Sequence, residues 1–187
     1  MKEERTFMSK KEEIMTIACD ALQRRGISGF SFRDLADMVG IKSSSVHYHF
    51  RSKNDLIKAI IVDFRSKASE YLIELEEKSS SLEEAFEGLI ELFEKVLRED
   101  KFCVCGMLAA EEKHLDDEVL QELKDTFTGL EKWVTGVATK YEIKSISPEA
   151  LARLVISSLE GALLIDRVYG NDNYFSALKE TVSYLIK

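Results

Sequence analysis

The residues with the most distinctive chemistry lie between Ser31 and Leu56, in the stretch SFRDLADMVGIKSSSVHYHFRSKNDL. A short helix predicted to begin at Lys42 presents hydrogen-bond donors on one face, and that face contains no carboxylate. The donors on this face are Lys42, Ser43, Ser44, His47, Tyr48 and His49. Side chains of these types reach phosphate oxygens and base edges. The pattern therefore indicates a surface that binds nucleic acid.

Two short helices joined by a tight turn must position this face. Ser31 and Asp34, three residues apart, predict a capping box at the start of the first helix. Gly40 supplies the permissive backbone that a turn between the two helices needs. Ser52 and Asp55 repeat the capping pair at the start of a third, long helix. This is the pattern of a helix–turn–helix unit, which inserts its second helix into the major groove of DNA.

Two other kinds of site are considered. His47 and His49 suggest metal binding, but side chains two residues apart on a helix diverge, so we predict no metal site. An enzyme on a helical scaffold is the alternative from another functional class. Against it, the sequence has no Gly-rich phosphate loop, no G-x-S-x-G elbow and no Ser-His-Asp order. We therefore predict no catalytic residue and no cofactor.

The region from about Lys10 to Leu56 resembles the TetR/AcrR family of one-component regulators. The resemblance is carried by Gly26, Phe30, Ser31, Arg33, Asp34, Leu35, Ala36, Val39, Gly40, Ser45, Tyr48, His49, Phe50, Ser52, Lys53 and Leu56. It implies that the second helix of the motif is the recognition helix, with Lys42 to Ser45 nearest the bases and Tyr48, His49 and Lys53 on phosphates. The family usually has a tyrosine where this chain has His47, so the role of that position stays open. The predicted DNA-binding residues are Ser31, Arg33, Lys42, Ser43, Ser44, Ser45, His47, Tyr48, His49 and Lys53.

The composition favours an all-α fold. Hydrophobic residues make up 45% of the 187 residues, and the chain has one Pro and few alternating Val-rich segments. Helical spacing predicts about nine helices. Residues 1–52 are expected to form the helix–turn–helix DNA-binding domain, and residues 53–187 a larger helical effector-binding and dimerisation domain. The charge divides in a similar way: residues 1–60 carry 11 basic and 8 acidic side chains, a net charge of +3, and residues 61–187 carry 15 and 26, a net charge of −11.

The sequence also bears on location and redox state. It has no run of about 18 apolar residues, and its N-terminus does not resemble a signal peptide. We expect a soluble, cytoplasmic protein with no membrane partner, and the odd number of Cys residues fits a reducing compartment. Cys103 and Cys105 are too close for a relaxed disulfide within one helix. They are interpreted as buried or pocket-lining, with a redox or electrophile sensor as the alternative, because thiolate reactivity rises near a helix N-terminus.

The resemblance implies an effector pocket in the second part of the chain. Aromatic and Met residues at helical spacing are candidates for its lining, although such residues also form plain cores. Glu160 is an acid inside an otherwise apolar helix, and it suggests a partner for the effector, for Arg153 or Arg167, or for a network at a dimer contact. The predicted pocket residues are Phe64, Phe86, Phe93, Cys103, Met107, Phe127, Leu130, Trp133 and Glu160.

A dimer contact is predicted near the C-terminus. From about Ser157 to Ile165 the sequence is apolar on almost all sides of the helix and rich in small residues, which allow close helix approach. Together with the last amphipathic helix it suggests a four-helix contact, two helices from each subunit, with plain intramolecular core as the alternative. The predicted contact residues are Leu154, Ser158, Gly161, Ala162, Ile165, Phe175, Leu178 and Val182. Two copies related by a two-fold axis would read a palindromic site.

Taken together, these features predict a ligand-responsive transcriptional regulator, most simply a repressor. Its expected partners are a double-stranded DNA operator, a second copy of the chain and a small-molecule effector whose identity the sequence does not give. An effector that prefers the conformation unable to bind DNA would shift the population by tilting the third helix of the motif. The alternatives are the cysteine-based sensor and the enzyme.

Overall fold

The computed structural model describes residues 8–186. Within this range the chain forms only helices, as the composition predicts. The α-helices are α1 (Lys10–Arg25), α2 (Phe32–Val39), α3 (Ser43–His49), α4 (Lys53–Lys78), α5 (Leu82–Arg98), α6 (Val104–Ala110), α7 (Asp117–Lys140), α8 (Pro148–Tyr169) and α9 (Asn173–Leu185). Short 3₁₀ helices cover Ile27–Gly29 and Glu112–His114. None of the helices in this part of the chain is long and apolar enough to cross a membrane.

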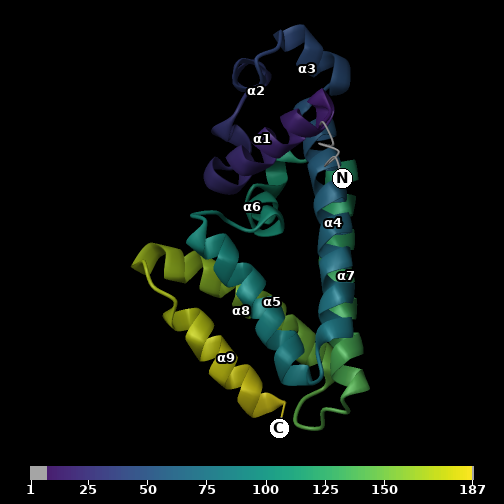
Figure 1. Ribbon diagram of the computed structural model, residues 1–187, viewed down its shortest axis with the longest axis vertical. Coiled ribbons are helices and arrows are strands. Elements are labelled where there is room, and N and C mark those ends of the chain that lie inside the picture. The colour runs from purple at the N-terminus through teal and green to yellow at the C-terminus, as the bar shows by residue number, and fades with distance from the viewer. Residues whose placement is uncertain (1–7, 187) are drawn as a thin grey trace, which may run out of the picture.

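The molecule is elongated, with α1, α2 and α3 at one end and α9 at the other (Figure 1). We call α1–α3 the head and α5–α9 the body. The long helix α4 begins directly after the head and runs beside α7 into the body, and it packs against both α1 and α7. Helix α8 packs against α5, α7 and α9. Because α4 contacts both parts, a domain boundary at residues 52 and 53 remains a prediction.

Capping pairs fix the starts of α2 and α4, the helices on either side of α3. The Asp34 backbone N–H donates to Ser31 Oγ (3.2 Å), and the Ser31 N–H donates to the Asp34 carboxylate (2.8 Å). Ser52 and Asp55 repeat both bonds at 3.0 Å. The two capping boxes expected from the sequence are therefore confirmed.

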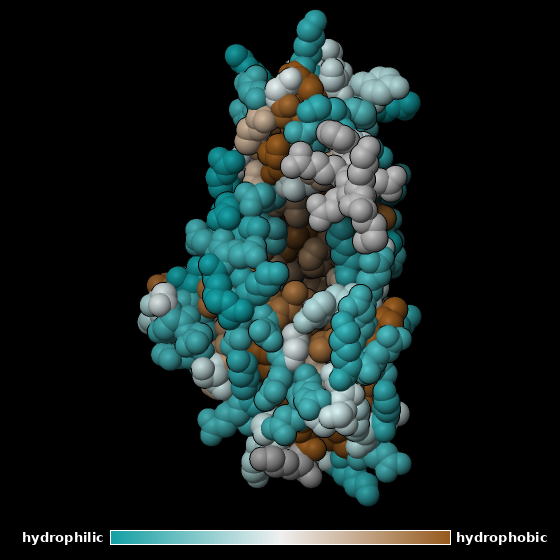
Figure 2. All heavy atoms as spheres, viewed as in Figure 1, coloured by the Kyte–Doolittle hydropathy of each residue, from teal (hydrophilic) through white to brown (hydrophobic). Residues whose placement is uncertain are grey.

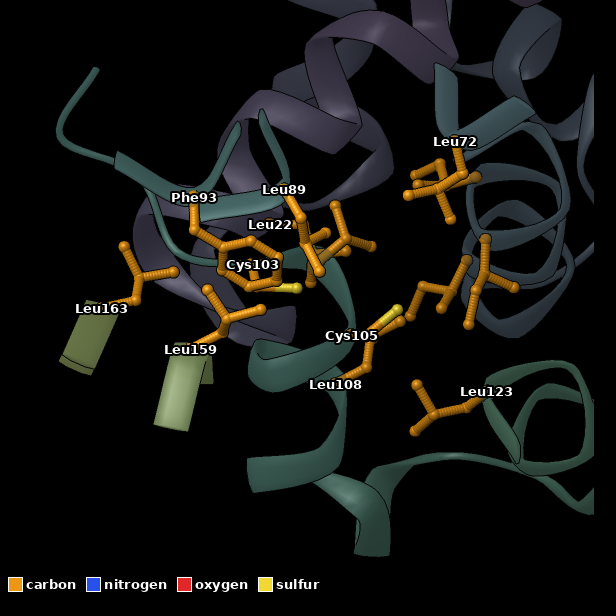
Figure 3. Close-up of a cluster of buried hydrophobic side chains, with 14 of the residues drawn as sticks. Leu22, Leu72, Leu89, Phe93, Cys103, Cys105, Leu108, Leu123, Leu159 and Leu163 are labelled. Carbon is orange, nitrogen blue, oxygen red and sulfur yellow. The ribbon is translucent and has the colours of Figure 1, made fainter. Parts of the chain in front are cut away.

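One hydrophobic core runs from the head into the body. Leu22, on the last turns of α1, is fully buried and belongs to the same cluster as Leu89, Phe93 and Cys103 (Figure 3). Because protein interiors are packed at crystal-like density, a shift of the body helices is felt at the end of α1. The head and the body thus share one packed core, and the head is not a separate domain on a linker.

The last two helices are joined by a buried carboxylate. Asp166 on α8 is fully buried, and its side chain accepts hydrogen bonds from the backbone N–H groups of Tyr174 (3.0 and 3.1 Å) and Phe175 (3.0 Å). These N–H groups belong to the first turn of α9 and have no partner within the helix. Asp166 therefore caps α9 from the neighbouring helix, although Asp172 stands at the N-cap position and makes no side-chain capping bond.

We expect Asp166→Ala to lower the free energy of unfolding by about 2 kcal/mol, because it leaves buried N–H groups without an acceptor. Asp172→Ala is the matched control and should change it by less than about 0.5 kcal/mol. Urea unfolding followed by circular dichroism, at equal protein concentrations, measures both. An equal decrease in the free energy of unfolding for the two variants would show that Asp166 does not cap α9.

Candidate nucleic-acid interface and internal cavity

The turn between α2 and α3 fixes the direction of α3, the predicted recognition helix. Gly40 takes a left-handed conformation (φ 72°, ψ 38°), and the Ile41 N–H donates to the Ala36 carbonyl (2.9 Å) to close α2. Val46 and Phe50 are buried and hold α3 and its end against the head. The opposite face of α3 consequently faces solvent.

The predicted DNA-binding residues lie on α3 and at the starts of α2 and α4, and they are exposed to different degrees. Seven are exposed: Ser31, Arg33, Lys42, Ser43, Ser44, His47 and Tyr48. Three are partly buried: Ser45, His49 and Lys53. Tyr48 is 85% exposed, which is unusual for a large aromatic side chain. The structure therefore brings these side chains onto one end of the molecule, which Figure 1 shows at α2 and α3.

Both histidines of α3 make contacts with neighbouring aromatic rings. His47, where the family usually has tyrosine, packs edge-on against Phe32 of α2 with ring centroids 4.9 Å apart. Tyr48 and His49 make a similar contact at 5.3 Å. His47 thus has a packing role between the two helices of the motif as well as an exposed edge.

Two of the predicted DNA-binding residues, Ser31 and Lys53, also form hydrogen bonds within the head or between the head and α4. The Ser31 hydroxyl donates to the Asp34 carboxylate (2.7 Å), and this bond, with the one from the Ser31 N–H, lowers the pKa of Asp34. The Lys53 ammonium donates to the Phe30 carbonyl (2.6 Å) and lies 4.3 Å from the centre of the Phe30 ring. Partial burial lowers the pKa of Lys53. Lys53 therefore ties the start of α4 to the segment before α2, and its contact with phosphate stays a prediction.

A partly open cavity of about 220 Å³ lies between α4 and the body helices α5, α6, α7 and α8. On the face shown in Figure 2, the region between α4 and α6 is hollowed, with hydrophobic residues at its bottom. Seven of the nine predicted pocket residues line the cavity: Phe64, Phe93, Cys103, Phe127, Leu130, Trp133 and Glu160. The sequence interpretation missed Arg65, Ala68, Ser69, Leu72, Ile73, Leu89, Leu92, Cys105, Thr126 and Gly129. The α4 members recur every three or four residues from Phe64 to Ile73, a periodicity that could have found them.

Phe86 and Met107 do not line this cavity, contrary to the prediction. Phe86 lies nearer the start of α5 than the residues that line it, and it is buried in the core. Met107 lies on the side of α6 that faces the head, where its sulfur packs close to Gly26. Helical spacing gives the apolar positions of α5 and α6 but not which of them border an open space.

Most polar groups that line the cavity have partners within the chain. The Trp133 indole N–H donates to the Leu72 carbonyl (3.0 Å), and the Thr126 hydroxyl donates to the Glu122 carbonyl (2.8 Å). Arg65 pairs with Glu122 (2.7 Å) and lies 3.8 Å from Asp125. The basic side chain at the cavity is thus already neutralised.

Glu160 differs from these groups. Arg153 pairs with Glu131 (2.9 Å) and Arg167 with Asp100 (2.9 Å), so neither arginine is its partner. Burial raises the pKa of the Glu160 carboxyl, and the nearby Cys103 thiol partly offsets this. Glu160 lines the cavity, which favours the first of the interpretations considered for it, a contact with a ligand.

The two thiols of the C-x-C pair are buried among leucine and phenylalanine side chains (Figure 3). The neighbouring Cys105, burial and the Glu160 carboxyl together raise the pKa of Cys103 well above its usual range. A reactive cysteine needs a stabilised thiolate and access to solvent. The environment of Cys103 supplies neither, so the geometry favours the pocket-lining interpretation.

The outer face of α8 and α9 carries several exposed apolar side chains, but they are not all residues that were predicted for a dimer contact. Ala162, Phe175, Leu178 and Val182 are buried inside the chain, where α9 packs against α5 and α8. The amphipathic pattern of α9 correctly marks a buried stripe, and that stripe serves the core of the single chain. The exposed large apolar side chains on these two helices are Leu154, Leu164, Val168, Tyr169, Tyr174 and Tyr184. Ser158, Gly161 and Ile165 are partly buried and lie on α8 between these positions.

The end of α1 is joined to the α5–α6 region by hydrogen bonds. The Phe102 N–H donates to the Gln23 carbonyl (2.9 Å), and the Gln23 side-chain amide donates to the Phe102 carbonyl (3.1 Å). The Ile27 N–H donates to the Glu111 carboxylate (3.0 Å). Phe102 and Glu111 stand on either side of α6, so this short helix, which also borders the cavity, supports the head.

A head with an exposed, donor-rich second helix, set on a helical body with an internal cavity, defines a DNA-binding regulator of the helix–turn–helix class. The family of bacterial regulatory proteins, tetR family, matches residues 14–60, and the LmrA/YxaF-like transcriptional regulator C-terminal domain matches residues 82–181. A TetR transcriptional regulator from Legionella pneumophila superposes with a TM-score of 0.87 at 30% identity, covering 97% of this chain and all of that one. The chain belongs to the TetR family of transcriptional regulators.

Two relatives show how the similarity is distributed. An HTH-type transcriptional regulator from the lacX 3′ region of Lactococcus lactis is 25% identical over 165 residues, covering 84% of this chain and 83% of that protein. The HTH-type transcriptional repressor KstR2 of Mycolicibacterium smegmatis is 34% identical over 56 residues, or 30% of this chain. The chain thus matches about a quarter of the length of KstR2 (27%), so most of KstR2 gives no guide to this protein.

Proposed function

We propose that the protein is a dimeric, ligand-responsive transcriptional repressor that binds a palindromic operator and leaves it when a small molecule occupies the body. One observation carries the proposal: the helix that borders the internal cavity, α6, also supports the end of α1 in the head. Repression, as opposed to activation, is supported by the similarity of 56 residues of this chain to the repressor KstR2.

In this proposal the outer face of α3 reads the operator. Lys42, Ser43 and Ser44 stand at the start of α3, where they would reach base edges in the major groove. Tyr48 and Arg33 would contact phosphates on either side. The acidic body disfavours DNA contact elsewhere on the molecule, because phosphate affinity depends on the local charge.

The second copy is proposed to cover the outer face of α8 and α9. Leu154, Leu164 and Val168 recur along the exposed side of α8, with Gly161 between them, and the space around Gly161 is open. An open glycine on an apolar face allows a second helix to approach closely. A contact there would present two heads, which fits a two-fold symmetric operator.

The response to a ligand is proposed to act through α4 and α6 together. Both helices line the cavity, and both contact the head. A ligand that fits only a widened cavity would shift α6. The shift would loosen the hydrogen bonds that Phe102 and Glu111, on either side of α6, form with Gln23 and Ile27. Such a ligand moves the population away from the head spacing that the operator needs.

For the DNA contact, we expect Tyr48→Ala and Lys42→Ala each to weaken operator binding by about tenfold, with the free energy of unfolding unchanged because both side chains are exposed. Lys42→Ala should also relax the base preference at the operator position that Lys42 contacts, because its proposed contact is to a base edge. Fluorescence anisotropy measures this on a duplex selected from random sequence by the wild-type protein.

The matched control is Lys132→Ala, which removes an exposed lysine from α7 in the body. This variant should bind the operator as tightly as the wild-type protein does. Operator affinity that is insensitive both to salt and to the two head substitutions would contradict the assignment of α3 as the reading helix.

For the dimer, we expect Leu164→Asp to give a monomer, because it places a charge at the centre of an apolar contact. Leu164 is 57% exposed in the single chain, so the substitution should leave the fold intact. Val62→Asp, at an exposed apolar position on α4, should stay dimeric. Analytical ultracentrifugation gives the masses, and a Leu164→Asp variant that remains a dimer would exclude this face.

A further inference from the structure

The cavity in the body is strongly aromatic. Phe64, Phe93, Phe127 and Trp133 line it from α4, α5 and α7, together with leucine side chains. An apolar cavity of about 150 Å³ accepts one benzene ring, so about 220 Å³ has room for a ligand of two small rings. The size and the lining of the cavity therefore indicate a ligand that is compact, apolar and at least partly cyclic.

One carboxyl group interrupts this apolar lining. Glu160 enters from α8, and its carboxylate lies directly against Gly106 of α6. A Cβ atom at position 106 would collide with a Glu160 carboxylate oxygen, so the glycine leaves the room that this carboxylate occupies. The acid is thus accommodated by the neighbouring helix at the edge of the cavity.

No cation within the described range compensates this acid. Arg153 and Arg167 are paired elsewhere, and Arg65, the basic residue that lines the cavity, is held by Glu122 and Asp125. The titratable neighbour of Glu160 is the Cys103 thiol, which is a weak hydrogen-bond donor, and Cys105 lines the same cavity. The cavity therefore offers a ligand one carboxyl group and no free positive charge.

These features select for the charge of the ligand. A carboxylate in an apolar site is costly unless a charged or hydrogen-bonding partner reaches it, and an ammonium group supplies both. The faces of aromatic rings also attract cations, most strongly when water is excluded. A ligand carboxylate would instead stand beside a like charge, and an uncharged ligand would forgo the ion pair.

We propose that the cavity binds a lipophilic amine, a compact apolar ligand whose protonated nitrogen pairs with Glu160. This inference rests on the proposed function, since it names the chemical class of the effector for the same cavity. Glu160 is the specificity-determining residue, and the aromatic rings supply apolar contact and cation–π attraction.

Trp133 allows a direct test, because it is the one tryptophan of the chain and lines the cavity. The probes are three bicyclic compounds of matched size: aminotetralin, its alcohol tetralol and the corresponding tetralin carboxylate. Quenching or shift of the Trp133 emission, checked by calorimetry, gives their affinities for the full-length protein. We expect the amine to bind about tenfold more tightly than the alcohol, and the carboxylate to bind least.

Two variants separate the charge of Glu160 from its packing. Glu160→Gln keeps the size of the side chain, so it should bring the amine to the affinity of the alcohol while the alcohol is unaffected. Glu149→Gln removes an exposed carboxylate from the first turn of the same helix and should keep the full preference for the amine. Retained alcohol binding also shows that the Glu160→Gln cavity is intact.

Three results would overturn the inference: equal binding of amine and alcohol, tighter binding of the carboxylate, or no binding by any of the three. Operator binding by the ligand-free protein is measured on the same preparations. If the operator binds while the amine preference is absent, the ligand class is wrong and the assignment as a DNA-binding repressor stands. If the operator does not bind, the proposed function itself fails.

Discussion

The position of the reading helix depends on how the end of α1 is held against the short helix α6. The main-chain groups of Phe102, just before α6, exchange two hydrogen bonds with Gln23, and Glu111, just after it, accepts one from the Ile27 N–H. Between these two anchors, the cavity side of α6 carries Cys105. Seven residues of helix therefore connect an internal space of the body to the base of the DNA-reading head.

This arrangement gives a physical reason to expect that a ligand in the cavity, as proposed, would affect the head. The core is continuous from Leu22 in α1 to the cavity wall, so it has few ways to absorb an inserted molecule without moving a helix. Packed interfaces of this kind change between discrete arrangements and do not deform gradually. Helix α4 provides a second connection, with Lys53 at its start bonded to the head and Phe64 further along it at the cavity. In the proposed response, a shift in the body would reach the head through both of these connections.

The head could be predicted from the sequence almost residue by residue, because its signals are local. Ser31 with Asp34 and Ser52 with Asp55 fix helix starts through bonds three residues apart, and Gly40 fixes the turn. The body could be predicted only in outline. Periodicity marked Phe175 as apolar, but it cannot say whether an apolar stripe faces the chain's own core or a second copy.

The cavity shows the same limit. Phe86 and Phe93 lie on one stripe of α5, and only the crossing of α4, α7 and α8 decides that the second of them borders an open space. Glu160 was recognisable as an acid in an apolar helix, whereas the absence of a pairing arginine and the room left by Gly106 are tertiary facts. The residues most informative about the ligand are thus the ones whose partners lie far away in the sequence.

Reciprocal linkage tests the central claim, that the cavity and the operator-binding head are coupled, most directly. The affinity of a ligand that quenches Trp133 would be measured with the free dimer and again with the dimer saturated by its operator duplex. The account predicts weaker ligand binding in the presence of the operator, by the same factor by which the ligand weakens operator binding. Equal ligand affinities in the two states would contradict it.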